Sequence, residues 1–312
     1  MSTFPSLSVW SFNLRTEFAN ERDGPNCWPE RRLGVAELIR GQRPAIVCTQ
    51  EATGPMLSFL LEELEDVNYS CLGSSRSASP DDERAGILYD RSQVMLQHHD
   101  TRWLAPPGAP KYAAGWDADC PRTLEIATFS LPERPATQLR VLNTHFDHFG
   151  VEARMQSAEL VADVVKTGAA EYPDCVHIIC GDFNSAKGSS PFYDCLVNPS
   201  VGLQDAARSS ADTVSAMPPF TIHMFQGLAF ESDRGDGTVE LKRSAAPESM
   251  VDSCHIDWIL WRDAQNCELR PLSYEVMTDM LPCGRYPSDH FPVKFHFTLQ
   301  EAELPSPHYA RL

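Results

Sequence analysis

The chain has 312 residues, of which 42% are hydrophobic and 22% are charged, so it can bury the core of one large domain or two small ones. Its 43 acidic residues outnumber its 26 lysines and arginines, which gives a formal net charge of −17 at pH 7. This balance is typical of a solvated acidic surface. It leaves little basic material for a long nucleic-acid footprint.

Ten cysteines are present, but none form a CxxC pair, and a chain of this length needs no disulfide framework. Cys48 and Cys180 close the apolar runs AIVC and HIIC, which predicts buried free thiols. The N-terminal sequence lacks the basic and apolar regions of a signal peptide, and no apolar run approaches the ~18–20 residues of a membrane helix. We therefore expect a cytoplasmic monomer without membrane insertion; a secreted form whose leader was removed stays open.

Short strands and helices alternate along the first part of the chain. A strand is predicted over residues 7–13, with Trp10 and Phe12 on one face. A helix over 31–40 ends before Pro44, and a buried strand then runs to Glu51. The next predicted elements are a helix over 55–65, a polar loop over 74–82, strands over 84–90, 94–100 and 101–105, and a Pro- and Gly-rich loop over 105–121.

The second part of the chain has the same character. The predicted elements are strands over 123–131 and 139–146, a helix over 152–166, a strand over 176–184, an exposed insertion or lid over 199–250, and strands over 254–261 and 288–299. Strands outnumber helices, and several neighbouring strands are joined by short turns. This pattern predicts a mixed-sheet sandwich with helices outside it, in one domain over residues 1–300 with a tail over 301–312.

Polar or ionisable residues end five of the strand-like runs, and a sixth pair lies just before the last strand. They are Asn13, Glu51, His145, Asp182 with Asn184, Asp257, and the pair Asp289 and His290. A single Asp at a strand end is more often a turn former or a helix cap. Six such positions in one chain favour a shared site, in which oxygen ligands hold a hard cation such as Mg²⁺ and imidazoles contact phosphate.

Four motifs carry a resemblance to a known family. IICGDFN, with NTHFDHFGVEAR upstream and IDWIL and PSDHFPV downstream, resembles the endonuclease/exonuclease/phosphatase (DNase I-like) superfamily, and in particular its poorly characterised microbial and fungal members. The resemblance runs from Asn13 to about Phe297, with the motifs in the family's order. It implies an α/β fold, a four-layer sandwich of two mixed β-sheets flanked by helices, with the active site at one end of the sheets.

The resemblance also implies a metal site and its ligands. Glu51 would be the principal ligand of Mg²⁺ or Mn²⁺. Asn13 would lie beside it and touch the metal or the phosphate, and Asp289 would bind the metal directly or through water. The sequence leaves open whether one metal ion or two are bound.

The remaining motif residues are implied to handle water and phosphate. Asp182 would orient or deprotonate the attacking water, and Asn184 would help to hold that water and a phosphate oxygen. His290 would contact the phosphate, oriented or charged by Asp257, and His145 would donate to a phosphate oxygen. In-line attack at phosphorus needs these same functions: a positioned water and neutralisation of the phosphate oxygens.

Three further residues are weaker substrate-binding candidates. Arg122 could clamp a phosphate, because a guanidinium pairs with phosphate through two hydrogen bonds. Asp147 shares an extended-chain face with His145 and could support it, although a turn or capping role before Gly150 explains it equally well. Trp116 could stack on a base or a sugar, or it could pin the Pro-rich loop.

These features lead to three hypotheses of function. The first is a divalent-metal-dependent phosphoester hydrolase, a phosphodiesterase or phosphatase, acting on a compact substrate such as a nucleotide, a phosphorylated sugar or a short oligonucleotide end. The second is a nuclease acting on DNA or RNA by the same chemistry. The third is a non-catalytic binding protein on the same fold, which the presence of Glu51, Asp182, Asn184 and His290 disfavours.

Overall fold

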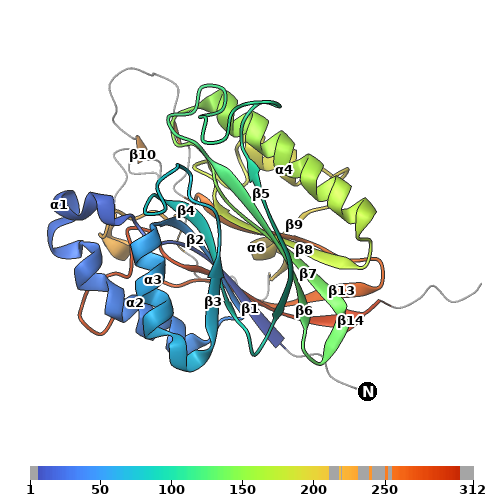
Figure 1. Ribbon diagram of the computed structural model, residues 1–312, viewed down its shortest axis with the longest axis horizontal. Helices are drawn as coiled ribbons and strands as arrows, with labels where there is room; N and C mark the ends of the chain where they lie inside the picture. Colours follow the sequence, from blue (N-terminus) through green and yellow to red (C-terminus); the bar gives the residue numbers. More distant parts are fainter. Residues whose placement is uncertain are drawn as a thin grey trace, which may run out of the picture.

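The computed structural model describes residues 6–210, 218, 220–230, 239–240, 250–251 and 255–302. Two six-stranded sheets pack against each other (Figure 1). The first has the order β13 (Cys267–Val276), β14 (Val293–Glu301), β1 (Ser6–Asn13), β2 (Ile46–Ala52), β4 (Arg84–Asp90), β3 (Tyr69–Leu72). The second has the order β5 (Met95–Trp103), β6 (Thr123–Leu131), β7 (Arg134–His145), β8 (Cys175–Asp182), β12 (Asp257–Arg262), β9 (Gln204–Asp205). The short strands β10 (Val239–Glu240) and β11 (Met250–Val251) form a separate two-stranded sheet.

Both sheets are mixed. In the first sheet β1 and β2 are parallel, and in the second β7 and β8 are parallel, while the other pairs are antiparallel. Parallel neighbours need a crossover connection. Helix α2 (Trp28–Gln42) supplies it between β1 and β2, and helix α4 (Val151–Glu171) supplies it between β7 and β8.

Helices form the two outer layers of the sandwich (Figure 1). Helices α2 and α3 (Gly54–Glu63) pack on the first sheet, and α4 with α5 (Pro191–Leu196) packs on the second. The alternation of strand side chains produces this layering. Trp10 and Phe12 face α2 and α3, while Val9 faces the core between the sheets. The predicted four-layer sandwich of two mixed sheets is therefore confirmed.

Short helical turns complete the described structure. They are α1 (Asn20–Asp23), α6 (Ala206–Ser209) and the 3₁₀ turns Glu17–Ala19, Gly24–Asn26, Glu65–Val67 and Gly227–Ala229. Thr16 and Thr53 cap the starts of the 3₁₀ turn Glu17–Ala19 and of α3 by accepting backbone N–H groups.

Several elements were not predicted from the sequence, among them β3, α5, β9, α6 and β13. The strand β13 is polar and contains Pro271, which normally argues against a strand. It lies at the sheet edge, and its register shifts between Pro271 and Ser273, so the missing N–H of the proline costs no ladder bond there. Two predicted strands over 94–105 are instead the single strand β5, and the last strand begins at Val293 rather than at Ser288.

Several other expectations can be compared with the described residues. Cys48 and Cys180 are fully buried free thiols, as predicted. Within the described part of the chain, no helix is long and apolar enough to span a bilayer. Most of the predicted insertion over 199–250, and the predicted tail from residue 303 onward, lie outside the described residues.

Candidate active site

The predicted strand-end residues meet at one end of the two sheets. In the second sheet the register places His145 opposite Asp182, and Asp182 opposite Asp257. In the first sheet Asn13 pairs with Gln50, the residue before Glu51. Parallel neighbours bring their C-terminal ends to the same edge, and the antiparallel β12 begins at that edge, so one edge collects residues from five strands.

An amide hydrogen-bonds to two carboxylates across the gap between the sheets. Asn13 Nδ2 donates to Glu51 Oε1 over 3.1 Å and to Asp182 Oδ2 over 2.9 Å. Glu51 Oε2 accepts from the backbone N–H of Thr16. Glu51 has φ of 57°, in the left-handed region, so its side chain leaves the strand direction at this point. Asn13 therefore holds the two carboxylates in a fixed relation.

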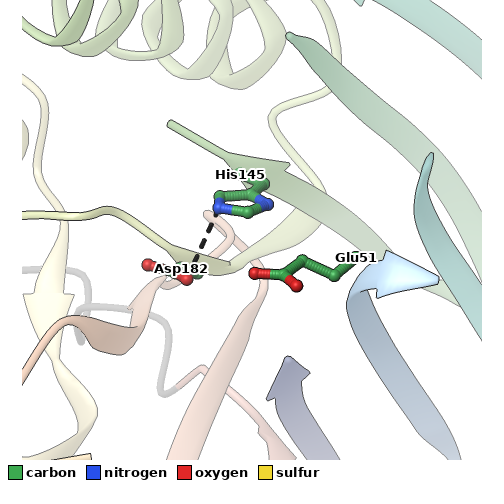
Figure 2. Close-up of side chains that lie close together, drawn as sticks. All are labelled: Glu51, His145 and Asp182. Carbon is green, nitrogen blue, oxygen red and sulfur yellow. Dashed lines mark ion pairs between the residues drawn. The ribbon is translucent and has the colours of Figure 1, made fainter. Parts of the chain in front are cut away.

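Glu51, His145 and Asp182 form a cluster of potential metal ligands (Figure 2). One ligand atom of each lies within 4.8 Å of the others. Burial disfavours charge on Glu51, but Arg15 and His290 outweigh it and lower its pKa. Burial, and next the charge of Asp257, raise the pKa of Asp182 to about 7. A divalent cation fits this donor set, because it would compensate the buried carboxylate of Asp182 and the partly buried one of Glu51.

The other two predicted metal ligands make different contacts. The amide oxygen of Asn13 accepts the backbone N–H of Arg15 over 2.9 Å, and its nitrogen faces the carboxylates, so it has no oxygen turned toward them. Asp289 Oδ2 lies 3.5 Å from Nη1 of Arg15. Asp289 lines the same cleft but does not belong to the cluster of three.

His290 and Asp257 form a buried pair. His290 Nδ1 lies 2.9 Å from Asp257 Oδ2, and its Nε2 lies 4.0 Å from Asp182 Oδ2. Although burial opposes it, the charge of Asp257 raises the pKa of His290 to about 10. His290 is therefore a cation over the physiological pH range. Asp257 therefore lies where it could orient His290, and its role in the reaction stays a prediction.

The pKa of His145 is shifted in the opposite direction to that of His290. Burial, and next the charge of Arg122, hold the pKa of His145 well below its usual value, so its ring is neutral near pH 7. Asn184 Nδ2 lies 3.0 Å from His145 Nε2 and donates to it, and the backbone N–H of Asn184 donates to Asp182 Oδ1 over 2.9 Å. The GDFN turn, in which Asn184 has φ of 47°, thus links Asp182 to His145.

A cleft of about 620 Å³ is lined by six of the predicted site residues, together with arginines that the motifs do not contain. The six are Glu51, His145, Asp182, Asn184, Asp289 and His290. Arg15 Nε lies 2.9 Å from Asp23 Oδ2, which fixes its guanidinium. Arg76 Nη1 lies 2.8 Å from Glu83 Oε2. Arg15, Arg76 and Arg122 carry positive charge into a cleft that also holds the acidic ligands.

The three weaker substrate-binding candidates lie in different environments in the structure. Arg122 lines the cleft, is 7% exposed, and donates toward His148 Nδ1 over 3.2 Å. Asp147 instead accepts the backbone N–H groups of Phe149 and Gly150 and lies 3.7 Å from Arg122 Nε. It therefore shapes the turn and steadies Arg122, and no hydrogen bond to His145 is found in the described structure. Trp116 is not among the described residues that line the cleft.

Sequence reasoning missed several cleft residues. They are Arg15, Arg76, Glu83, Met224 and Phe225. Arg15 follows the SFN motif by two positions, which was the only sequence signal for any of them. The others lie in loops without periodicity, and only the fold brings them to the cleft.

The fold and the cleft define a class of protein. A family model described as the Endonuclease/Exonuclease/phosphatase family matches residues 10–290, and the chain belongs to this family. Its members are hydrolases that act on phosphoesters.

The chain is also similar to individual known proteins over most of its length. The chain is 26% identical to a mannosyl-6-phosphatase from Bacteroides thetaiotaomicron, with a TM-score of 0.75 over 94% of this chain and 99% of that one. It is 20% identical to D. rerio TDP2 complexed with a single-strand DNA product, with a TM-score of 0.63 over 94% and 99% of the two chains. Nocturnin from Drosophila melanogaster is 23% identical over 295 residues, 87% of this chain, and the match spans 42% of that relative's length.

Proposed function

We propose that this protein hydrolyses a compact phosphoester by attack of water at phosphorus, with Mg²⁺ or Mn²⁺ as its metal. The observation that carries the proposal is the gathering of a buried imidazolium, a buried neutral imidazole, the buried carboxylate of Asp182 and the partly buried carboxylate of Glu51 around one cleft. Each of these groups has a role in phosphoryl transfer, and a purely structural role does not explain why they are gathered around one cleft.

The residues divide the reaction between them. Asp182 accepts a proton from the attacking water or orients it, and Asn184 keeps that carboxylate in place through its backbone N–H. His290, held charged by Asp257, donates to a phosphate oxygen or to the leaving oxygen. Arg122 pairs with another phosphate oxygen.

Glu51, Asp182 and His145 are the residues that would hold the metal ion. When bound, the metal supplies positive charge that stabilises the phosphate oxygens as the new bond forms. Asn13 contributes by fixing Glu51 and Asp182 through its two hydrogen bonds. Asp289, predicted to be a ligand, would act through a water in this arrangement.

The size of the cleft supports a compact substrate. A volume of about 620 Å³ lies within the range of small-molecule sites. The net charge of −17 disfavours a long nucleic-acid footprint. The similar mannosyl-6-phosphatase makes a phosphorylated sugar one candidate substrate, beside nucleotides and short oligonucleotide ends.

The test is a screen of phosphomonoesters and phosphodiesters with Mg²⁺, Mn²⁺ or EDTA. The variant Asp182→Ala should lose activity by about a thousandfold on every substrate that the wild type hydrolyses. The matched control is Asp163→Ala on α4, whose side chain is 73% exposed and pairs only with Lys166 among the described residues. A wild type no faster than Asp182→Ala on all substrates, nucleic acids included, would contradict the proposal.

The alternative of a DNA or RNA nuclease uses the same residues. The fold similarity to TDP2 in complex with single-strand DNA keeps this alternative in view. Binding of single-stranded DNA at increasing salt separates the two. A steep loss of affinity would favour the nuclease, because it reports many phosphate contacts.

A further inference from the structure

The segment Thr221–Phe225 is tied to the catalytic residues by its backbone. The N–H groups of His223 and Met224 donate to the carbonyl of Asp289 over 2.8 and 3.1 Å. Ile222 forms an isolated β-bridge with His290, and the N–H of Phe291 donates to Thr221 O. The segment therefore follows the position of the Asp289–His290 turn.

A second attachment fixes the segment to the neighbouring strand. The hydroxyl of Thr221, which is fully buried, accepts the backbone N–H groups of Ile256 and Asp257 over 3.0 and 3.1 Å. Thr221 thus connects the segment to Asp257 and, through its carbonyl, to Phe291, the residue after His290. The side chains that follow Thr221 are therefore held at a fixed position beside the His290–Asp257 pair.

Those side chains give the cleft an apolar wall, which consists of Ile222, Met224, Phe225 and Ile256. Met224 is 42% exposed. A smaller recess of the cleft, lined by Arg76, Arg122 and Glu51, includes no residue of the apolar wall. Within the cleft, Arg76 and Arg122 therefore border a recess that the apolar wall does not reach.

The backbone of the wall is strained in a way that packing does not require. Met224 and Phe225 have φ of 48° and 62°, a conformation that residues with a side chain seldom adopt in succession. The hydrogen bonds to Asp289 hold Met224, and the guanidinium of Arg31 lies 5.4 Å from the ring of Phe225. Strain of this kind is found where a side chain must be presented to a ligand.

We propose that the apolar wall binds the organic part of the substrate, and that this part is a planar aromatic group such as a nucleobase or an aryl ester. The inference rests on the proposed function, and it narrows the substrate class. Met224 offers a polarisable thioether and Phe225 an aromatic face, and both contact rings well. In this arrangement Arg76 and Arg122 bind the phosphate, and the apolar wall binds the ring.

Two phosphodiesters with the same leaving group test the wall: bis(p-nitrophenyl) phosphate and methyl p-nitrophenyl phosphate. They differ only in the group that stays on phosphorus, aryl or methyl. In the double variant Met224→Ala, Phe225→Leu, the ratio of kcat/KM for the aryl over the methyl substrate should fall about tenfold, mainly through KM. The kcat/KM for the methyl substrate should fall less than that for the aryl substrate.

The control is Leu228→Ala, which removes a 62% exposed side chain from the adjoining turn outside the cleft lining. It should leave the ratio unchanged. An unchanged ratio in the double variant, or an equal fall for both substrates, would overturn the inference.

A binding measurement separates this inference from the proposed function. Calorimetry with phenyl phosphate and methyl phosphate needs no turnover. Wild type should bind phenyl phosphate at least about fivefold more tightly, and the double variant should lose that preference. Equal affinities in wild type would overturn the inference even if catalysis is found, and a preference without hydrolysis would support the wall while the proposed function fails.

Discussion

Replacement of Asp257 by asparagine should leave the ring of His290 in place and lower its pKa. Asp257 Oδ2 lies 2.9 Å from His290 Nδ1, and both side chains are buried. Asparagine has nearly the same shape and keeps an oxygen that can accept from Nδ1–H. It lacks the negative charge that most favours the imidazolium.

The structure sets the size of the effect. The rise in the pKa of His290 from 6.5 to about 10 corresponds to about 5 kcal/mol in favour of the charged ring. Asp182 and Asp289 also support this charge. We therefore expect Asp257→Asn to lower the pKa by about two units or more, which is about 3 kcal/mol. With the pKa lowered to about 8 or below, at least half of the rings would be neutral at pH 8.

The sign of the accompanying stability change follows from the raised pKa. In wild type the charged ring stabilises the folded protein below pH 6.5, and this contribution is lost as the pH rises toward about 10. In Asp257→Asn the loss should occur at lower pH. The upper limb of the pH–rate profile should move in the same direction.

The assay is an NMR titration of the His290 ring protons, assigned by their disappearance in His290→Gln. It reads the pKa directly and does not depend on turnover. A pKa that stays near 10 in Asp257→Asn would refute the reasoning, because the charge would then come from other groups.

Three further predictions concern other titratable or charged side chains: His177, Lys187 and Arg122. Burial lowers the pKa of His177 to about 4, so wild type should lose about 3 kcal/mol of unfolding free energy as the pH falls from 6.5 to 4, and His177→Gln should not; equal pH dependence in denaturant titrations would contradict this. Lys187 Nζ lies 3.0 Å from Asp205 Oδ1, and Lys187→Met should cost about 2 kcal/mol by removing the buried cation from a carboxylate that keeps its bonds to Tyr193 and Ala207, with partial recovery when Asp205→Asn is added; full stability of the single variant would count against it. Arg122→Gln should lower kcat/KM by about 10- to 100-fold, whereas the exposed Arg102→Gln should not, and similar kinetics for both would exclude a phosphate role for Arg122.

The strand ends could be predicted from the sequence because local rules determine them. The run TLEIATFSL alternates between two apolar cores, with Leu124 and Ile126 facing α4 and Ala127 and Phe129 facing the other sheet. A polar residue that ends such a run has to lie at the sheet edge. The family motifs then supplied the roles of residues such as Asp182, which spacing alone could not.

Residues whose roles depend on distant contacts escaped prediction. Arg31 reads as one charge among several on a helix, yet it is fully buried and donates to the carbonyls of Leu14 and Pro287, which joins two loops of the cleft. Met224 and Phe225 lay in a stretch read as an exposed insertion. Met224 is placed by a hydrogen bond from its N–H to the carbonyl of Asp289, 65 positions away, and no local pattern encodes such a pairing.

Hydrolysis in ¹⁸O-labelled water tests the central claim most directly, with the best substrate from the phosphoester screen and its preferred metal. Attack of water at phosphorus predicts one labelled oxygen in the phosphate product and none in the alcohol. Asp182→Ala should show no labelled product above the uncatalysed background. Label in the alcohol would contradict the account, because it would mean that the site breaks the carbon–oxygen bond.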